Sequence, residues 1–116
     1  DWAEYQRRTA SMDRADWQNG KQQVDEVERA LVEAFNRGVK PGSEEANALA
    51  ERHRASLFFF EVTPAKHAIL ARGYVKDARF KAHYEKLATG LAEWLRDAIY
   101  ENARAHGVDP EEATWG

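Results

Sequence analysis

The sequence contains no cysteine and no long apolar segment. Without cysteine, disulfides, thiolate catalysis and cysteine-ligated zinc sites are excluded. The longest apolar cluster is Leu57-Phe58-Phe59-Phe60, far shorter than the roughly 18 residues that predict a transmembrane helix. No signal-peptide pattern precedes this cluster. We therefore expect a soluble, cytoplasmic protein without a membrane partner.

The chain also lacks a basic excess. Its 17 Lys and Arg residues are outnumbered by 20 Asp and Glu residues, which gives a net charge of −3. Strong binding to nucleic acid or to an anionic membrane needs a surplus of positive charge on one face. If the protein contacts DNA, we expect another part of the polypeptide to do so. Because the chain begins at Asp1 without a methionine, we expect it to be a domain excised from a longer protein.

Motifs for catalysis and for cofactor binding are missing as well. The sequence has no phosphate-binding loop, no dinucleotide fingerprint and no nucleophile elbow. The four histidines do not show the spacing of a metal site, and Ser11, Ser43 and Ser56 have no triad-like context. We expect no enzymatic activity, no metal and no cofactor.

Large apolar residues are scarce in the N-terminal part of the chain. Residues 1–23 contain no Leu, Ile, Val or Phe, and their large apolar residues are Trp2, Tyr5, Met12 and Trp17. Ordering a backbone costs about 1–2 kcal/mol per residue, which this segment offsets poorly by apolar burial. We therefore predict that residues 1–23 form a helical flap that is mobile without a ligand and orders over a bound one.

Apolar residues recur at helical spacing over the rest of the sequence. The pattern predicts a helix from about Asp13 to Arg37, and further helices that begin after Ser43, Thr63, Asp77 and Gly90. Gly107 is a natural stop for the last helix. No alternating strand pattern occurs. The sequence predicts an all-α fold with a core over residues 24–107 and a loose tail over residues 108–116.

The same pattern predicts which residues face the core. In the helix after Ser43 the stripe continues through Leu57 to Phe60, in the third helix it includes His67 and Tyr74, and in the short fourth helix it includes Phe80, Tyr84 and Leu87. In the last helix Trp94 belongs to the buried side.

Several segments together resemble one known family. They are the run Tyr74-Val75-Lys76-Asp77-Ala78-Arg79-Phe80, then Tyr84, then residues 90–99, together with Arg52-His53 and the Phe59-Phe60 pair before Thr63. This set is similar to the TipA-type antibiotic-recognition domain, called TipAS, of MerR-family transcriptional activators. The similarity extends from about Val24 to Gly107 and is densest after Leu49.

The resemblance implies a globin-like helical fold without haem and with a deep cleft. In that family the domain follows a winged helix-turn-helix and a dimerising coiled coil, so DNA contact and homodimerisation would belong to the full-length protein and the isolated domain would be monomeric. The implied ligands are bulky, largely apolar antibiotics, with thiopeptides as the type case. There a cysteine captures the antibiotic covalently. Because this sequence has no cysteine, we expect non-covalent capture.

Eight residues are candidates for the ligand site: Trp17, His53, Leu57, Phe59, Phe60, Tyr74, Tyr84 and Trp94. Trp17 is best explained by ligand contact because its surroundings offer little core. His53 is either a hydrogen-bonded core histidine or a donor to a ligand carbonyl. Only the analogy with the globin fold supports haem ligation by His53 or His67.

The aromatic candidates have structural alternatives too. Residues 58–60 are three consecutive phenylalanines, which span too much of a helix to face one core, so at least one of them packs against a neighbouring helix, a partner or a ligand. Tyr74 and Tyr84 are either half-buried structural residues or part of an amphipathic cleft lining. Trp94 fits the core best.

These observations favour an effector-binding domain that senses a bulky apolar antibiotic and thereby controls transcription of resistance or stress genes. The alternative is a protein-interaction or dimerisation module of a stress or stationary-phase regulator with no small-molecule ligand.

Overall fold

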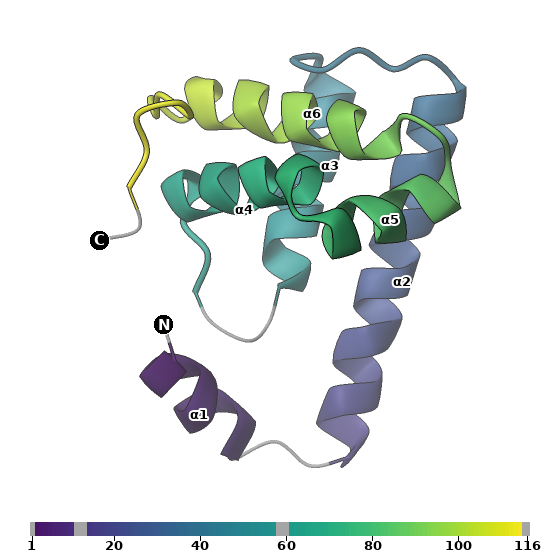
Figure 1. Ribbon diagram of the computed structural model, residues 1–116. Helices are drawn as coiled ribbons and strands as arrows, with labels where there is room; N and C mark the ends of the chain where they lie inside the picture. The colour runs from purple at the N-terminus through teal and green to yellow at the C-terminus, as the bar shows by residue number, and fades with distance from the viewer. Residues whose placement is uncertain (1, 11–13, 58–60, 115–116) are drawn as a thin grey trace.

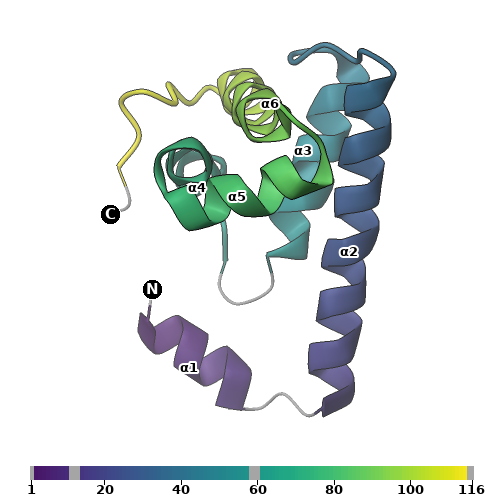
Figure 2. The ribbon, with the colours of Figure 1, turned by 45° about the vertical axis from the view of Figure 1, so that its right-hand side comes forward.

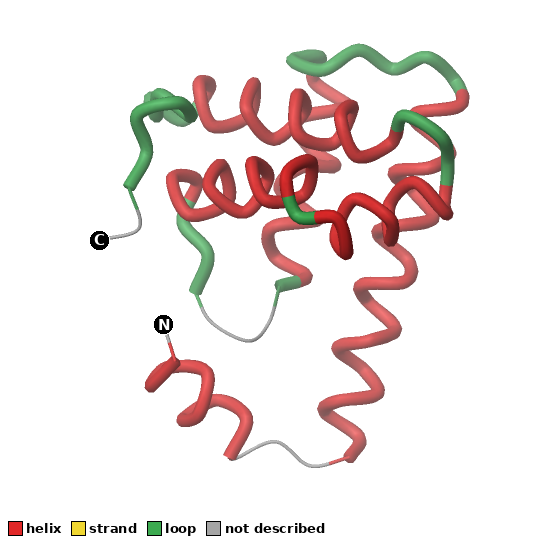
Figure 3. Tube along the Cα trace, in the orientation of Figure 1, coloured by secondary structure: helices red, strands yellow, loops and turns green. Residues whose placement is uncertain are grey.

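Six α-helices follow one another in the computed structural model, which describes residues 2–10, 14–57 and 61–114 (Figure 1). They are α1 (Trp2–Ala10), α2 (Arg14–Asn36), α3 (Glu44–Ser56), α4 (Pro64–Lys76), α5 (Ala78–Leu87) and α6 (Leu91–Ala105). Within these ranges every regular element is a helix and no strand occurs (Figure 3), so the all-α prediction is confirmed. No helix of the described segments has the length and apolarity needed to cross a bilayer.

Local sequence signals determine where the helices begin. The side chains of Ser43, Thr63 and Asp77 accept hydrogen bonds from backbone N–H groups two or three residues further on, at 3.2, 3.2 and 2.9 Å. Each of these bonds satisfies a donor that a helix start leaves without an internal partner. Gly90, at φ 91°, turns the chain from α5 into α6 in the left-handed region that favours glycine. The predicted starts after these four residues are confirmed.

The helix α3 is shorter than its apolar stripe predicts. It ends at Ser56, and Leu57 is its C-cap, with φ −83° and ψ 82°. The Leu57 N–H donates to Arg54 O, three residues back, at 3.3 Å, and Ser56 Oγ donates to His53 O at 2.7 Å. The last turn therefore tightens and closes, and the prediction that the helix continues through Leu57 is wrong. Residues 58–60 lie outside the described part of the chain.

The core lies between α6, α4, α3 and the C-terminal half of α2, as Figure 2 shows. Leu31, Leu91, Leu95 and Ile99 are completely buried. Alanines fill the narrow spaces between helices, and this small residue lets the backbones approach closely: Ala34, Ala50, Ala71 and Ala92.

The short helix α5 lies on the surface of this core. Tyr84 is buried as predicted, but Phe80 is 51% exposed and Leu87 is 39% exposed. The prediction that these two residues point inward is wrong, because α5 packs on α4 and α6 and buries only Tyr84. Their exposure leaves apolar surface on α5.

The helix α2 has two different halves. Residues 14–19 are exposed, whereas Val27, Leu31 and Ala34 are buried. At 1.5 Å per residue the helix is about 34 Å long, and in Figures 1 and 2 its N-terminal half extends beyond the other helices while α1 lies below α4. We call α1 and residues 14–23 of α2 the N-terminal arm. The predicted domain boundary at residue 23 falls inside a continuous helix.

The arm and the tail each contact the core at a few points. The Glu61 N–H donates to Glu4 Oε1 at 2.9 Å, which joins α1 to the segment before α4. In the tail Pro110 is completely buried, and Arg72 Nη2 donates to its carbonyl oxygen at 2.9 Å. These contacts fix the first residues of the tail, which the sequence predicts to be loose, to α4.

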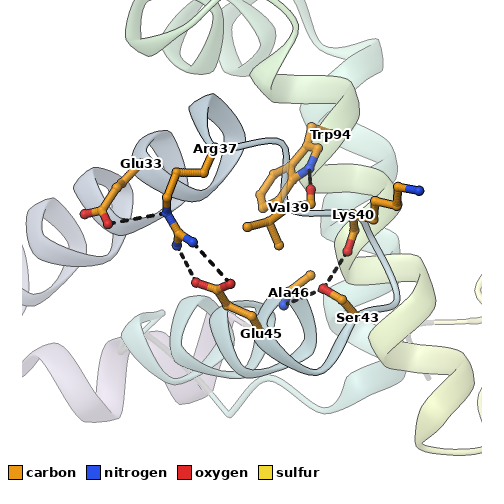
Figure 4. A network of polar contacts seen from close by, with 8 residues as sticks. All are labelled: Glu33, Arg37, Val39, Lys40, Ser43, Glu45, Ala46 and Trp94. Carbon is orange, nitrogen blue, oxygen red and sulfur yellow. Dashed lines mark hydrogen bonds and ion pairs between the residues drawn. The ribbon is translucent and has the colours of Figure 1, made fainter.

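Polar contacts hold the joint between α2 and α3 (Figure 4). Arg37 pairs with Glu45 across the joint. The Trp94 indole N–H donates to Val39 O at 2.8 Å, and the Trp94 ring meets Phe35 edge-on, with ring centroids 6.1 Å apart. Trp94 is thus half-buried and fixes the α2–α3 loop to α6.

We expect Ser43→Ala to lower the free energy of unfolding by about 1 kcal/mol, because it removes the cap of α3. It also removes the hydrogen bond that Ser43 Oγ donates to Lys40 O at 2.7 Å. Urea denaturation followed by circular dichroism measures this change. Ser43→Thr, which keeps the hydroxyl, is the control, and an equal loss in both variants would contradict the capping role.

Candidate functional site

A chain of buried polar side chains joins α3, α4 and α5. His53 Nδ1 lies 2.9 Å from His67 Nε2, and His53 Nε2 lies 3.1 Å from the Tyr84 hydroxyl. The Tyr84 ring also contacts the ring of Tyr74, with centroids 5.0 Å apart. All four residues are at most 5% exposed. We call them the His–Tyr network.

Burial keeps every member of the His–Tyr network uncharged at neutral pH. It lowers the pKa of His53 from 6.5 to about 4, and burial together with the neighbouring His53 ring lowers the pKa of His67 to about 2. It raises the pKa of Tyr74 to about 12, and that of Tyr84 further. A neutral imidazole has one donor and one acceptor nitrogen, so the chain of hydrogen bonds forms only if all members donate in the same direction. General acid–base catalysis needs a pKa near the working pH, so the network is suited to structure and recognition.

A second polar contact joins the network to α2. Glu28 Oε2 lies 2.6 Å from His83 Nε2, and the Glu28 side chain is 11% exposed. The His83 ring meets the Tyr84 ring edge-on, with centroids 5.0 Å apart. Because Glu28 is on α2 and both rings are on α5, this contact connects the base of the N-terminal arm to the network.

Two grooves lie on either side of α2, where the arm joins the core. One, of about 380 Å³, lies toward α5 and is lined by Asp25, Glu28, Arg29, Val32 and Leu87. The other, of about 220 Å³, lies toward α3 and is lined by Gln23, Glu26, Val27, Arg52, Ala55 and Ser56. The larger of the two has the volume of a small-molecule site. Both grooves have partly apolar linings and lie where the N-terminal arm joins the core.

Exposed aromatic residues occur on the arm and on α5. Trp2 is 70% exposed and stacks on Tyr5 with ring centroids 5.2 Å apart, and Trp17 is 37% exposed. On α5 the exposed ring of Phe80 lies 5.8 Å from the ring of Tyr74. The aromatic surface of α5 is therefore continuous with the His–Tyr network, and exposed apolar surface of this kind commonly marks a binding site.

The structure brings three of the eight predicted site residues together: His53, Tyr74 and Tyr84. His53 is the hydrogen-bonded core histidine of the first alternative, with both ring nitrogens engaged by protein partners. Leu57 is half-buried directly after α3. Phe59 and Phe60 lie outside the described residues.

The other two predicted residues lie apart from the network. Trp17 is on the arm and Trp94 is at the α2–α3 joint. Sequence reasoning missed the pairing of His67 with His53 and the contact between Glu28 and His83. The available signal was that His53 and His67 both occupy apolar helix faces, where a buried polar group needs a partner. Among the described residues no group of three or more metal-ligating side chains gathers.

Comparison with known proteins identifies a family and several relatives. The TipAS antibiotic-recognition domain family matches residues 1–102. The HTH-type transcriptional activator TipA of Streptomyces coelicolor is 35% identical over 101 residues, which are 85% of this chain and 40% of TipA. The HTH-type transcriptional regulator SkgA of Caulobacter vibrioides is 30% identical over 97 residues, 81% of this chain and 38% of SkgA. The chain thus spans about two fifths of these regulators.

A solved structure is similar as well. It is the TipAS protein of Streptomyces lividans in complex with the thiopeptide antibiotic nosiheptide. The TM-score is 0.82 at 32% sequence identity, and the match covers 91% of this chain and 76% of that chain. The likeness includes most of the described helices.

We expect Tyr84→Phe to lower the free energy of unfolding by about 1–3 kcal/mol, because it leaves the buried His53 nitrogen without its partner. Tyr100→Phe is the matched control, since its hydroxyl has no hydrogen bond to the described residues, and its effect should stay within about 0.5 kcal/mol. Urea denaturation of the two variants gives both values. Equal effects would contradict a structural role for the network.

The stability should fall as the pH falls from about 6.5 toward 4. The folded pKa values of His53 and His67 lie below 6.5, so in this window the unfolded chain binds protons that the folded chain does not. The slope of unfolding free energy against pH should therefore be positive, and His67→Gln should reduce it. Denaturation curves at several pH values measure the slope, and a flat profile between pH 4.5 and 6.5 would refute the assignment.

Proposed function

This chain belongs to the TipAS family of antibiotic-recognition domains, and we propose that it is the effector-binding domain of a MerR-type transcriptional activator that binds a bulky, largely apolar antibiotic without covalent capture. The observation that carries this proposal is the structural likeness to TipAS in complex with nosiheptide, at a TM-score of 0.82. The family is one of ligand-binding regulatory domains, not of enzymes.

The proposed ligand site lies between the N-terminal arm and the surface formed by α5 and the end of α3. Trp17 would contact the ligand from the arm, and Leu57, Phe59 and Phe60 would contact it from the segment after α3. The exposed ring of Phe80 supports this location because it forms aromatic surface beside Tyr74. The grooves on either side of α2 lie at the base of the same region.

In this proposal the His–Tyr network has a supporting role. His53, Tyr74 and Tyr84 form the wall behind the apolar surface, since His53 hydrogen-bonds Tyr84 and the Tyr74 ring packs against both of the other rings. Trp94 keeps the α2–α3 joint in place and does not contact the ligand. The ligand would meet mainly apolar and aromatic groups, which suits a bulky apolar antibiotic.

The proposed binding energy comes from apolar burial, at about 25 cal/mol per Å². Ordering of the arm reduces the net gain. The exposure of residues 14–19 supports an arm that moves without a ligand. The mobility of the arm, the division at residue 23 and the globin-like arrangement of the core helices stay predictions.

The remaining parts of the proposal concern the full-length protein. We infer that DNA is contacted by a separate helix-turn-helix domain and that the whole regulator is a homodimer, as a MerR-type activator requires. A ligand that binds only when the arm is ordered stabilises the conformations of the regulator in which the arm is ordered. By linkage, it increases the population of the DNA-bound conformation that contains an ordered arm. Transcription of resistance or stress genes would follow from this shift.

Addition of nosiheptide should shift the tryptophan emission to shorter wavelength in a saturable manner, because the exposed Trp2 and Trp17 become buried. Trp17→Phe should reduce the shift and weaken binding about tenfold, the effect of losing roughly 1.4 kcal/mol of contact energy. Fluorescence titration measures both quantities.

Trp94→Phe is the matched control and should leave the titration unchanged. If a panel of thiopeptides and other bulky apolar antibiotics gave no response while the emission depended on protein concentration, the interaction module without a small-molecule ligand would replace this proposal.

We further expect the complex to be fully reversible. The chain has no cysteine, so denaturing mass spectrometry of the nosiheptide-saturated domain should give the mass of the free protein. A stable adduct would contradict non-covalent capture.

A further inference from the structure

A groove of about 570 Å³ runs between α4 and α6, apart from the N-terminal arm. Its lining comes from α4, α6, the α2–α3 loop and the tail: Pro41, Arg72, Val75, Lys76, Arg96, Asp97, Tyr100, Glu101, Arg104 and Glu111. None of these residues belongs to the arm, to α5 or to the His–Tyr network. The proposed antibiotic site therefore does not account for this groove.

Some of the charged side chains in this groove form ion pairs with one another, and others do not. Arg96 pairs with Asp97 at 2.9 Å and Arg104 pairs with Glu101 at 2.6 Å. Arg72 and Lys76 lie one helical turn apart on α4, on the same face. Within the described part of the chain neither forms an ion pair, and Arg72 Nη2 meets only the backbone carbonyls of residues 110 and 111. A guanidinium has five N–H donors, so Arg72 keeps donors available for an anion.

The same groove contains apolar surface and one unused hydroxyl. The half-buried side chains of Val75 and Tyr100 come from its two helices, and Pro41 adds a third apolar group. The Tyr100 hydroxyl makes no hydrogen bond with the described residues. The lining thus combines two cations, a free hydroxyl and an apolar wall within the volume of a small-molecule site.

We propose that this groove is a second ligand site, for a small organic anion with one carboxylate or sulfonate and an aromatic or apolar body. The anionic group lies between Arg72 and Lys76, and the body lies against Val75 and Tyr100. The carboxylates of Asp97, Glu101 and Glu111 line the same groove and repel a polyanion, which disfavours nucleic acid. The site is independent of the antibiotic site, because the two share no lining residue.

Naphthalene-2-sulfonate is a suitable probe, titrated into ¹⁵N-labelled protein and followed by NMR. Saturable shifts should be confined to the amides of residues 72–76, residues 96–104 and Glu111. Lys76→Gln should raise the dissociation constant about fivefold, as expected for the loss of one solvent-exposed, charge-assisted hydrogen bond. Tyr100→Phe should also weaken binding while leaving stability unchanged. Lys86→Gln, an exposed lysine on α5, is the matched control and should bind as the original chain does.

Several outcomes would overturn the proposal. One is the absence of saturable shifts, and another is a set of shifts centred on α1 or α5. Equal binding of 2-naphthol, which is uncharged at pH 7, would show an apolar surface without anion recognition. Equal binding of inorganic phosphate would show a simple anion contact without a role for the aromatic body. None of these outcomes depends on whether nosiheptide binds at the arm.

Discussion

The two hydrogen bonds of the His53 ring determine how α3, α4 and α5 fit together. The ring is buried between His67 on α4 and Tyr84 on α5, at 2.9 and 3.1 Å. A buried polar group without a partner destabilises the fold, so the three helices are stable together only in an arrangement that satisfies both nitrogens. Apolar packing alone would tolerate small shifts of these helices, whereas hydrogen bonds of fixed direction do not. The network therefore provides a rigid wall beneath the aromatic surface of α5.

Within the described residues the N-terminal arm contains no comparable network of buried polar side chains. The C-terminal half of α2 is held by Val27, Leu31 and Ala34 in the core, and the contact between Glu28 and His83 is its polar link to α5. Toward its N-terminus the helix is mostly exposed: residues 14–19 are all exposed, whereas Gly20 is buried. In our proposal the wall and a movable arm together enclose a bulky ligand, and ordering of the arm buries surface that the free domain exposes. Regions that move on binding are generally those of low local stability.

The sequence predicted the fold class and most helix starts because these depend on local chemistry. Ser43, Thr63 and Asp77 cap helices wherever the backbone offers free N–H groups, without reference to the rest of the chain. The errors arose where tertiary packing decides. The exposure of Phe80 and Leu87 depends on how neighbouring helices lie, which periodicity does not report. The early end of α3 comes from the hydrogen bonds of its last turn, which periodicity does not report either. The contact between His53 and His67 could not be predicted from periodicity either, because it joins residues 14 positions apart on two helices.

We propose that a bound ligand orders the arm over a core that is already rigid. Hydrogen–deuterium exchange, with and without nosiheptide, tests this most directly because it reports on each helix separately. We expect rapid exchange of α1 and residues 14–23 in the free domain, slow exchange of α3, α4 and α6 in both states, and strong protection of the arm in the complex. Strong protection of the arm without ligand, or no added protection in the presence of saturating nosiheptide, would contradict this proposal.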